Sequence, residues 1–182
     1  MNNLKTKKLT ELGIALALAT ILNFIKIYEL PQGGSVSLEM VPIFFIALRW
    51  GIKEGLILGS TYGVLQLLLG AKIYYPIQAV LDYPVAFSVL GLAGIINTWL
   101  RKAKIKKRII LVIIGVLLGG ALRLLVHTIS GVVFFSQYAP ESQNVWIYSS
   151  VYNLSYMLPE TIITIIIMIF LLKSSADLLE RN

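Results

Sequence analysis

Long apolar stretches separated by short polar breaks dominate this chain. About 20 mostly apolar residues are enough for a helix to cross the roughly 30 Å hydrocarbon core of a bilayer. The pattern predicts helices over residues 9–28, 38–48, 52–69, 76–100, 109–135 and 148–172. We therefore expect an all-α fold, a polytopic bundle of six transmembrane helices that forms a single transmembrane domain over residues 1–182.

Glycines and prolines add local detail to this pattern. Gly55, Gly59 and Gly63 recur every four residues in the third predicted helix, a spacing that lets a neighbouring helix approach closely. Segment 30–35 contains a proline and a glycine pair and is expected to be a loop. Its glycines suit either a tight turn or the hinge of a lid. Pro84 lies inside the fourth predicted helix, where it frees a backbone carbonyl one turn earlier.

Composition and charge agree with a membrane protein. Hydrophobic residues make up 57% of the chain, charged residues 14%, and the mean hydropathy is +0.81. A net charge of +7 could indicate nucleic acid binding, but the basic residues cluster on one predicted side of the bundle. They are Lys5, Lys7, Lys8, Arg49, Lys53, Arg101, Lys102, Lys104, Lys106, Lys107, Arg108, Lys173 and Arg181. The positive-inside rule then predicts a cell membrane protein, with both termini and loop 101–108 in the cytoplasm.

Several kinds of chemistry lack the residues they need. The chain has no cysteine, which excludes disulfides and thiolate chemistry, and its single histidine argues against a conventional zinc site. It has neither a phosphate-binding P-loop nor a pair of catalytic carboxylates. We expect no enzymatic activity, no metal and no cofactor, so any energy for transport has to come from another protein.

Polar residues at membrane depth form two predicted layers. Charged groups there cost several kcal/mol unless they are paired or hydrated. At about 1.5 Å per residue, Asp82, His127 and Asn153 lie roughly 8 to 12 Å below the outer helix ends. Arg123 and Glu160 lie about 18 Å deep. We expect the deeper residues to pair and the outer three to line a hydrated pocket. The alternative is a pair between Arg123 and Asp82, which would withdraw the carboxylate from ligand binding.

Aromatic residues surround the outer layer. One carboxylate with several aromatic faces suits an organic cation, since each cation-π contact contributes about 0.5 to 2 kcal/mol. An interfacial aromatic belt is the alternative explanation. The aromatic residues are Tyr74, Tyr75, Tyr83, Phe134, Phe135, Tyr138, Trp146, Tyr148, Tyr152 and Tyr156.

Short motifs in several segments resemble a known family. They are LPQGGSVS at 30–37, LDY at 81–83, HTISG at 127–131, WIY at 146–148 and YN at 152–153. Together they resemble the thiamine-binding S components of energy-coupling factor (ECF) transporters. The resemblance implies a bundle of six helices that captures thiamine outside the cell. Its expected partners are a transmembrane coupling subunit, two cytoplasmic ATPase subunits and membrane lipid, with no nucleic acid.

The same resemblance assigns residues to the ligand. Asp82 would face the thiazolium cation, while His127, Tyr148 and Asn153 hold the remaining groups. The other site residues it implies are Tyr83, Gly131, Phe135 and Tyr75. Some members have Glu at the position of Asp82, and Asp is one methylene shorter. Some also have Trp at the position of Phe135.

Helix 1 contains two pairs of small residues that could contact a second membrane protein. The family resemblance favours Ala15 and Ala19 as the surface that meets the coupling subunit. Gly13 and Ala17 form another such pair, and packing within the chain is the alternative for both. For the chain as a whole, two other functions stay open: capture of another vitamin or a thiamine precursor, and a scaffold whose polar layer only packs the bundle.

Overall fold

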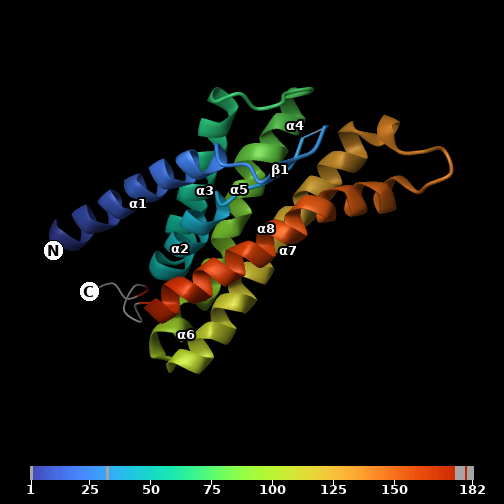
Figure 1. Ribbon diagram of the computed structural model, residues 1–182. Helices are drawn as coiled ribbons and strands as arrows, with labels where there is room; N and C mark the ends of the chain where they lie inside the picture. The colour runs from blue at the N-terminus through green and yellow to red at the C-terminus, as the bar shows by residue number, and fades with distance from the viewer. Residues whose placement is uncertain (1, 32, 175–178, 180–182) are drawn as a thin grey trace.

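Six helices make up most of the described chain, which comprises residues 2–31, 33–174 and 179 of a computed structural model (Figure 1). They are α1 (Asn2–Asn23), α2 (Met40–Trp50), α3 (Ile52–Leu68), a continuous helical segment Pro76–Lys102, α7 (Ile105–Phe134) and α8 (Val145–Ser174). A short 3-10 turn, η3 (Ser136–Tyr138), follows α7. The predicted all-α bundle of six helices is confirmed.

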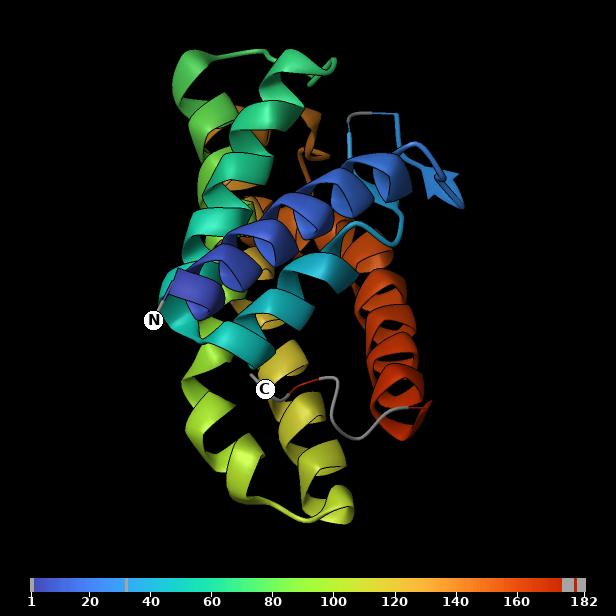
Figure 2. The same cartoon turned by 90° about the vertical axis from the view of Figure 1, so that its left-hand side faces the viewer.

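Three helices of the described residues are long and apolar enough to cross a membrane. They are the segment Pro76–Lys102, α7 and α8. α2 is apolar as well, but its 11 residues are fewer than a span needs on its own. Loop 69–75 and the turn between Pro76–Lys102 and α7 lie at opposite ends of the bundle (Figures 1 and 2). The basic turn at 101–108 thus lies at the end of the bundle opposite loop 69–75.

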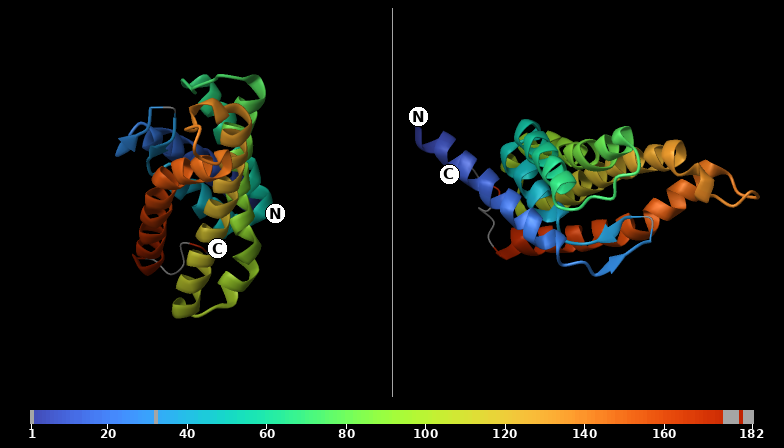
Figure 3. Two further views of the ribbon diagram at one scale, coloured as in Figure 1. Left: turned by 90° about the vertical axis from the view of Figure 1, so that its right-hand side faces the viewer. Right: turned by 90° about the horizontal axis from the view of Figure 1, so that it is seen from above.

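A small β ribbon stands where the sequence predicted the end of a helix and a loop. α1 ends at Asn23 rather than at residue 28, and β1 (Tyr28–Glu29) pairs antiparallel with β2 (Ser35–Val36). The turn between the strands contains Gly33 and Gly34, whose φ angles of 108° and 89° are readily adopted by glycine. The ribbon runs alongside α8 in the view from above (Figure 3).

The segment Pro76–Lys102 is helical throughout but changes its winding. It comprises α4 (Pro76–Val80), a π turn η1 (Leu81–Val85), α5 (Ala86–Ser88), a 3-10 stretch η2 (Val89–Ile96) and α6 (Asn97–Lys102). Pro84 lies inside the π turn. Since proline has no N–H and its ring crowds the preceding turn, it disfavours regular α-helical bonding there. The same π turn carries Asp82 and Tyr83.

Glycines on α3 form a close contact with this segment, as their spacing predicted. A Cβ on Gly59 would overlap the carbonyl oxygen of Phe87, and one on Gly63 would lie 2.5 Å from Cα of Pro84. A Cβ on Gly55 would lie 2.7 Å from Cα of Gly91. The two helices therefore meet backbone to backbone beside the π turn, which leaves the turn little room to move.

Substitution of Gly59 by Ala is expected to destabilise the protein by about 1 to 3 kcal/mol, because the new methyl group overlaps backbone that cannot rotate away. Thermal unfolding of the purified protein in detergent measures the change. The control is Gly13→Ala on α1, where a Cβ would meet nothing within 4 Å. Gly13→Ala should leave stability unchanged or raise it slightly. Equal melting temperatures for the two variants would contradict the close contact.

The N-terminal half of α1 is fixed to α2 by a polar clamp. Glu11 accepts hydrogen bonds from Nε and Nη2 of Arg49 at 2.6 and 2.9 Å, and from the indole N–H of Trp50 at 2.7 Å. A second ion pair of 2.6 Å joins Lys8 to Glu54 on α3. α1 thereby lies obliquely across α2 and α3 (Figure 2).

This placement decides which small residues of α1 are exposed. Ala15 and Ala19 belong to the hydrophobic core, with 5% and 0% of their surface exposed. The expectation that these two form a surface for a partner is therefore corrected: they pack within the chain. Gly13 and Ala17 lie on the exposed side of α1.

Candidate ligand-binding cavity

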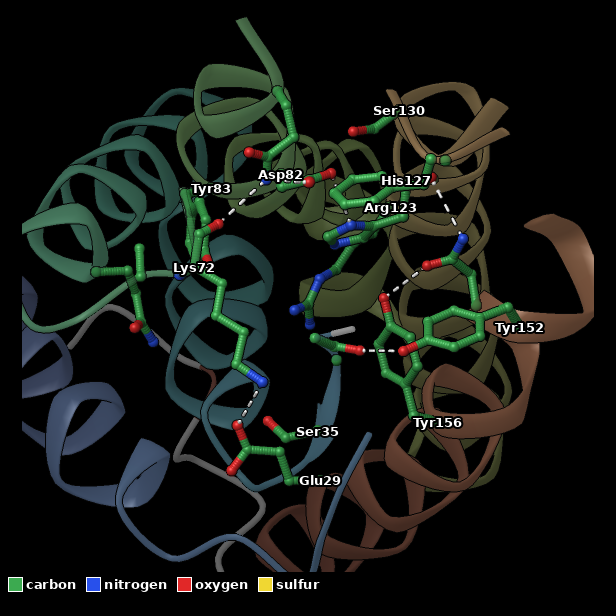
Figure 4. A pocket seen from close by; sticks show the side chains of 18 of the residues that line it. Glu29, Ser35, Lys72, Asp82, Tyr83, Arg123, His127, Ser130, Tyr152 and Tyr156 are labelled. Atoms are coloured by element: carbon green, nitrogen blue, oxygen red, sulfur yellow. Dashed lines mark hydrogen bonds and ion pairs between the residues drawn. The ribbon is translucent and has the colours of Figure 1, made fainter. Parts of the chain in front are cut away.

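A cavity of about 240 Å³ lies among η1, α7 and α8, with the β ribbon along one side (Figure 4). Seven of the eight residues expected to contact a ligand line it. They are Asp82, Tyr83, His127, Gly131, Phe135, Tyr148 and Asn153. The outer polar layer inferred from helical depth is thus one cavity in the structure.

Asp82 is held at both carboxylate oxygens. Its Oδ1 lies 3.2 Å from Nδ1 of His127, and its Oδ2 accepts a hydrogen bond of 2.6 Å from Nε2 of Gln78. Nε2 of His127 is buried and has no hydrogen-bond partner among the described residues. The site therefore holds a negative charge that is oriented at both carboxylate oxygens, one of them fixed by the histidine ring.

Asn153 links α8 to α7 behind the histidine. Its Nδ2 donates to the carbonyl oxygens of His127 and Ser149, at 3.3 and 2.9 Å, and its Oδ1 accepts a bond of 2.8 Å from the hydroxyl of Tyr156. Gly131 allows this close approach, since a Cβ there would overlap Oγ of Ser149. The structure thus brings Asn153 to the cavity with its amide already bonded to protein groups.

Aromatic rings form two walls of the cavity. Tyr148, Tyr152 and Tyr156 follow one another along α8, with ring centroids 6.3 and 6.5 Å apart. On the other side Phe135 packs edge-on against Tyr74, with centroids 5.3 Å apart. All five residues line the cavity, which supports the sequence prediction that aromatic faces surround the carboxylate.

Tyr75 is the one predicted contact that the structure moves out of the site. It is 47% exposed and lies against Phe134, with ring centroids 5.5 Å apart. Its extended backbone, with φ −138° and ψ 144°, precedes the first turn of α4 and directs its side chain away from that of Tyr74. Tyr74 lines the cavity in its place.

The β ribbon is tied to both sides of the cavity. The Tyr152 hydroxyl donates to the carbonyl oxygen of Gly33 at 2.8 Å, and Nζ of Lys72 donates to that of Pro31 at 3.2 Å. Lys72 also lies 3.5 Å from Glu29, which forms a second ion pair with Lys26 at 3.1 Å. The hydrogen bond from Lys26 and the charges of both lysines lower the pKa of Glu29, so this surface carboxylate stays ionised.

A buried cluster of charges lies beneath the outer layer. Arg123 forms ion pairs with Glu160 at 3.3 Å and with Glu39 at 3.5 Å, and its guanidinium lies 4.2 Å from the ring centre of Phe87. Glu39 also accepts a hydrogen bond of 2.6 Å from Tyr62. The predicted pair between Arg123 and Glu160 is confirmed, and Asp82 pairs with His127 rather than with Arg123.

The sequence interpretation missed two residues of the site. Glu39 precedes a short apolar helix and was not among the residues placed at membrane depth, yet only 4% of it is exposed. Gln78 stands four residues before Asp82, on the same helical face, and that spacing was an available signal. Its Oε1 accepts hydrogen bonds from the backbone N–H groups of Tyr74 and Tyr75, at 3.0 and 3.4 Å.

Comparisons with known proteins agree on one family. A family model described as a thiamine transporter protein matches residues 9–180. The thiamine transporter ThiT of Bacillus subtilis is 41% identical over 182 residues, which cover 96% of this chain and 95% of that protein. ThiT of Lacticaseibacillus paracasei is 31% identical, with coverages of 92% and 88%. A solved structure of ThiT from Listeria monocytogenes superposes with a TM-score of 0.89 at 31% identity, covering 98% of this chain and all of that one.

Proposed function

Because this chain belongs to the thiamine transporter protein family, we propose that it captures thiamine in the cavity around Asp82. The observation that carries the proposal is a carboxylate, fixed at both oxygens, in a cavity walled by aromatic rings. Thiamine is a small organic cation with an aromatic pyrimidine. It therefore matches both the charge and the walls of this cavity.

Each part of the site would have a separate task. Asp82 supplies the negative charge for the thiazolium, and His127, which also lines the cavity, orients that charge through its Nδ1. The rings of Tyr148 and Phe135 supply stacking surfaces. Asn153 holds the backbone around His127 in place, since its amide is bonded within the protein. The β ribbon would close over the bound ligand.

The proposal is tested by purifying the full chain in detergent without added ligand. Mass spectrometry of the denatured protein should detect co-purified thiamine. Calorimetric titration of the ligand-free protein with thiamine should show one site per chain. Absence of released thiamine, together with no heat on titration, would overturn the proposal. If the protein binds another vitamin but does not respond to thiamine, the cavity captures that other vitamin instead.

Gln78 is expected to position Asp82 for this ligand. Gln78→Met removes the amide while keeping the length of the side chain, so Asp82 loses one hydrogen bond and the N–H groups of Tyr74 and Tyr75 lose their acceptor. We expect thiamine affinity to fall about tenfold, the effect of one hydrogen bond to a charged group. Calorimetry measures the change. The control is Gln137→Met, at an exposed residue, and it should bind thiamine as the parent protein does. Equal losses of affinity in the two variants would contradict the role of Gln78.

We further propose that the chain is the substrate-specific subunit of an ECF transporter. The sequence contains no P-loop for ATP, so the energy for uptake would come from two cytoplasmic ATPases through a transmembrane coupling subunit. The distribution of lysine and arginine supports a cell membrane location with the basic turn at 101–108 and both termini in the cytoplasm. The cavity would then open to the exterior.

The exposed side of α1 is the surface that would meet the coupling subunit. Ala17→Trp places a large ring on this side and is expected to reduce association with the coupling complex at least tenfold, because close helix packing requires small residues. Thiamine binding should be unchanged, since Ala17 is not among the residues that line the cavity. Co-purification with the coupling complex measures association. The control is Ile166→Trp on α8, at a residue that is 61% exposed. Equal loss in both variants would exclude a specific surface on α1.

A further inference from the structure

The turn between α6 and α7 carries a dense group of cations that the cavity does not use. Residues 101–108 include six basic side chains, and the sequence has no acidic residue between 83 and 140. Lys102, Lys104, Lys106 and Lys107 are all exposed. Their positive charge is therefore not offset by any acidic residue within 83–140.

The two arginines of the turn serve its internal structure instead. Nε of Arg108 donates to the carbonyl oxygen of Ala103 at 2.9 Å, and Nη2 of Arg101 donates to Oδ1 of Asn97 at 2.9 Å. Asn97 in turn donates to the carbonyl oxygen of Arg49 at 3.0 Å, which fixes the turn to the end of α2. The lysines are thus presented by a turn whose backbone is held in place.

Apolar side chains lie among the lysines. A surface hollow at this turn is lined by the four lysines together with Trp99, Ala103 and Ile105. Trp99 is 58% exposed and Ile105 is 42% exposed. Both belong to helices that are long and apolar enough to cross a membrane, at the ends where those helices meet the predicted cytoplasmic surface. Tryptophan at such a position typically lies at the level of the lipid head groups.

We propose that this hollow binds the phosphate of an anionic phospholipid in the cytoplasmic leaflet. The lysines contact the phosphate, and Trp99 and Ile105 pack against the upper part of the acyl chains. A lipid suits this surface better than an acidic protein segment, because the exposed apolar residues belong to membrane helices and face hydrocarbon rather than water. The site is separate from the cavity and does not depend on the identity of the captured ligand.

The test measures lipid binding to the full chain purified in detergent. Native mass spectrometry with dioleoyl phosphatidylglycerol should show at least one retained lipid, whereas dioleoyl phosphatidylcholine should be lost. In a variant with Lys104→Gln, Lys106→Gln and Lys107→Gln, affinity should fall about fivefold per lysine, on the order of 100-fold in total. The control carries Lys5→Gln, Lys53→Gln and Lys173→Gln, which removes equal charge from exposed lysines on the same predicted side.

Four outcomes would overturn the proposal. Equal loss in the two triple variants would mean that only overall charge matters. Equal retention of phosphatidylcholine would remove the need for an anionic head group. Displacement of the lipid by millimolar glycerol phosphate would show that a soluble phosphate suffices without the acyl chains. Thiamine titration checks both triple variants, which should bind thiamine as the parent protein does. Loss of thiamine binding only in the variant with Lys104→Gln, Lys106→Gln and Lys107→Gln would show that the turn and the cavity are not separate sites.

Discussion

Replacement of Asp82 by Asn is expected to weaken thiamine binding by about 2 to 3 kcal/mol, roughly 30- to 160-fold in Kd. The change removes the charge from a largely enclosed carboxylate whose side chain is 15% exposed. It keeps the size of the side chain, so the packing of the π turn stays intact. Calorimetric titration of the parent and the variant with thiamine measures the difference.

Two comparisons separate charge from shape in this experiment. A neutral aminopyrimidine that lacks the thiazolium should bind Asp82→Asn almost as well as it binds the parent. Asp82→Glu introduces the residue expected at this position in some family members, and this variant should retain tight thiamine binding. If the aminopyrimidine loses as much affinity as thiamine does, Asp82 does not act through its charge on the cation.

Replacement of Arg123 by Met is expected to have the largest effect on stability. The guanidinium lies between Glu160, which is 0% exposed, and Glu39, which is 4% exposed. Without the guanidinium, the two carboxylates remain buried without this cation. We expect this to lower the free energy of unfolding by about 3 to 5 kcal/mol. The apparent melting temperature in detergent should fall well below that of Gly59→Ala.

The role of charge in this loss can be separated from that of volume. Adding Glu39→Gln and Glu160→Gln to Arg123→Met removes both uncompensated charges and leaves the other side chains in place. This triple variant should recover most of the stability lost by Arg123→Met alone. If the triple variant is no more stable than the single one, the guanidinium acts mainly through its packing on Phe87.

Depth along a helix could be predicted well from the sequence. A helix advances about 1.5 Å per residue, and a bilayer sets a common reference plane for several helices. That reasoning placed Asp82, His127 and Asn153 at one level, and the structure joins them through contacts of 3.2 and 3.3 Å. It also predicted the pair of Arg123 and Glu160, because few charges at the deeper level were available to pair.

Rotation of a helix about its own axis was much harder to predict. Successive residues are about 100° apart, so a shift of two residues turns nearly to the opposite face. On α1 both faces are apolar with small residues, and neither pattern nor composition distinguishes Ala15 and Ala19 from Gly13 and Ala17. The polar clamp around Glu11 decides the orientation, and its partners Arg49 and Trp50 are 38 and 39 residues away in sequence.

Residues in irregular segments were also beyond prediction. Glu39 reaches the buried cluster from the position just before α2, whereas the sequence interpretation included it in a predicted helix over 38–48 and gave it no role. Tyr74 and Tyr75 are adjacent and chemically identical, so only the backbone before α4 determines which ring faces the cavity. Both cases depend on tertiary contacts that no local pattern encodes.

The backbone contact between α3 and the segment Pro76–Lys102 has a consequence for the thermodynamics of capture. With Gly59 and Gly63 packed against the chain on either side of Val85, the π turn that carries Asp82 is ordered before any ligand arrives. Little conformational entropy then remains to be lost at this wall when the cation binds. The entropic cost of capture falls instead on the β ribbon, so we expect the ribbon to govern how fast thiamine enters and leaves.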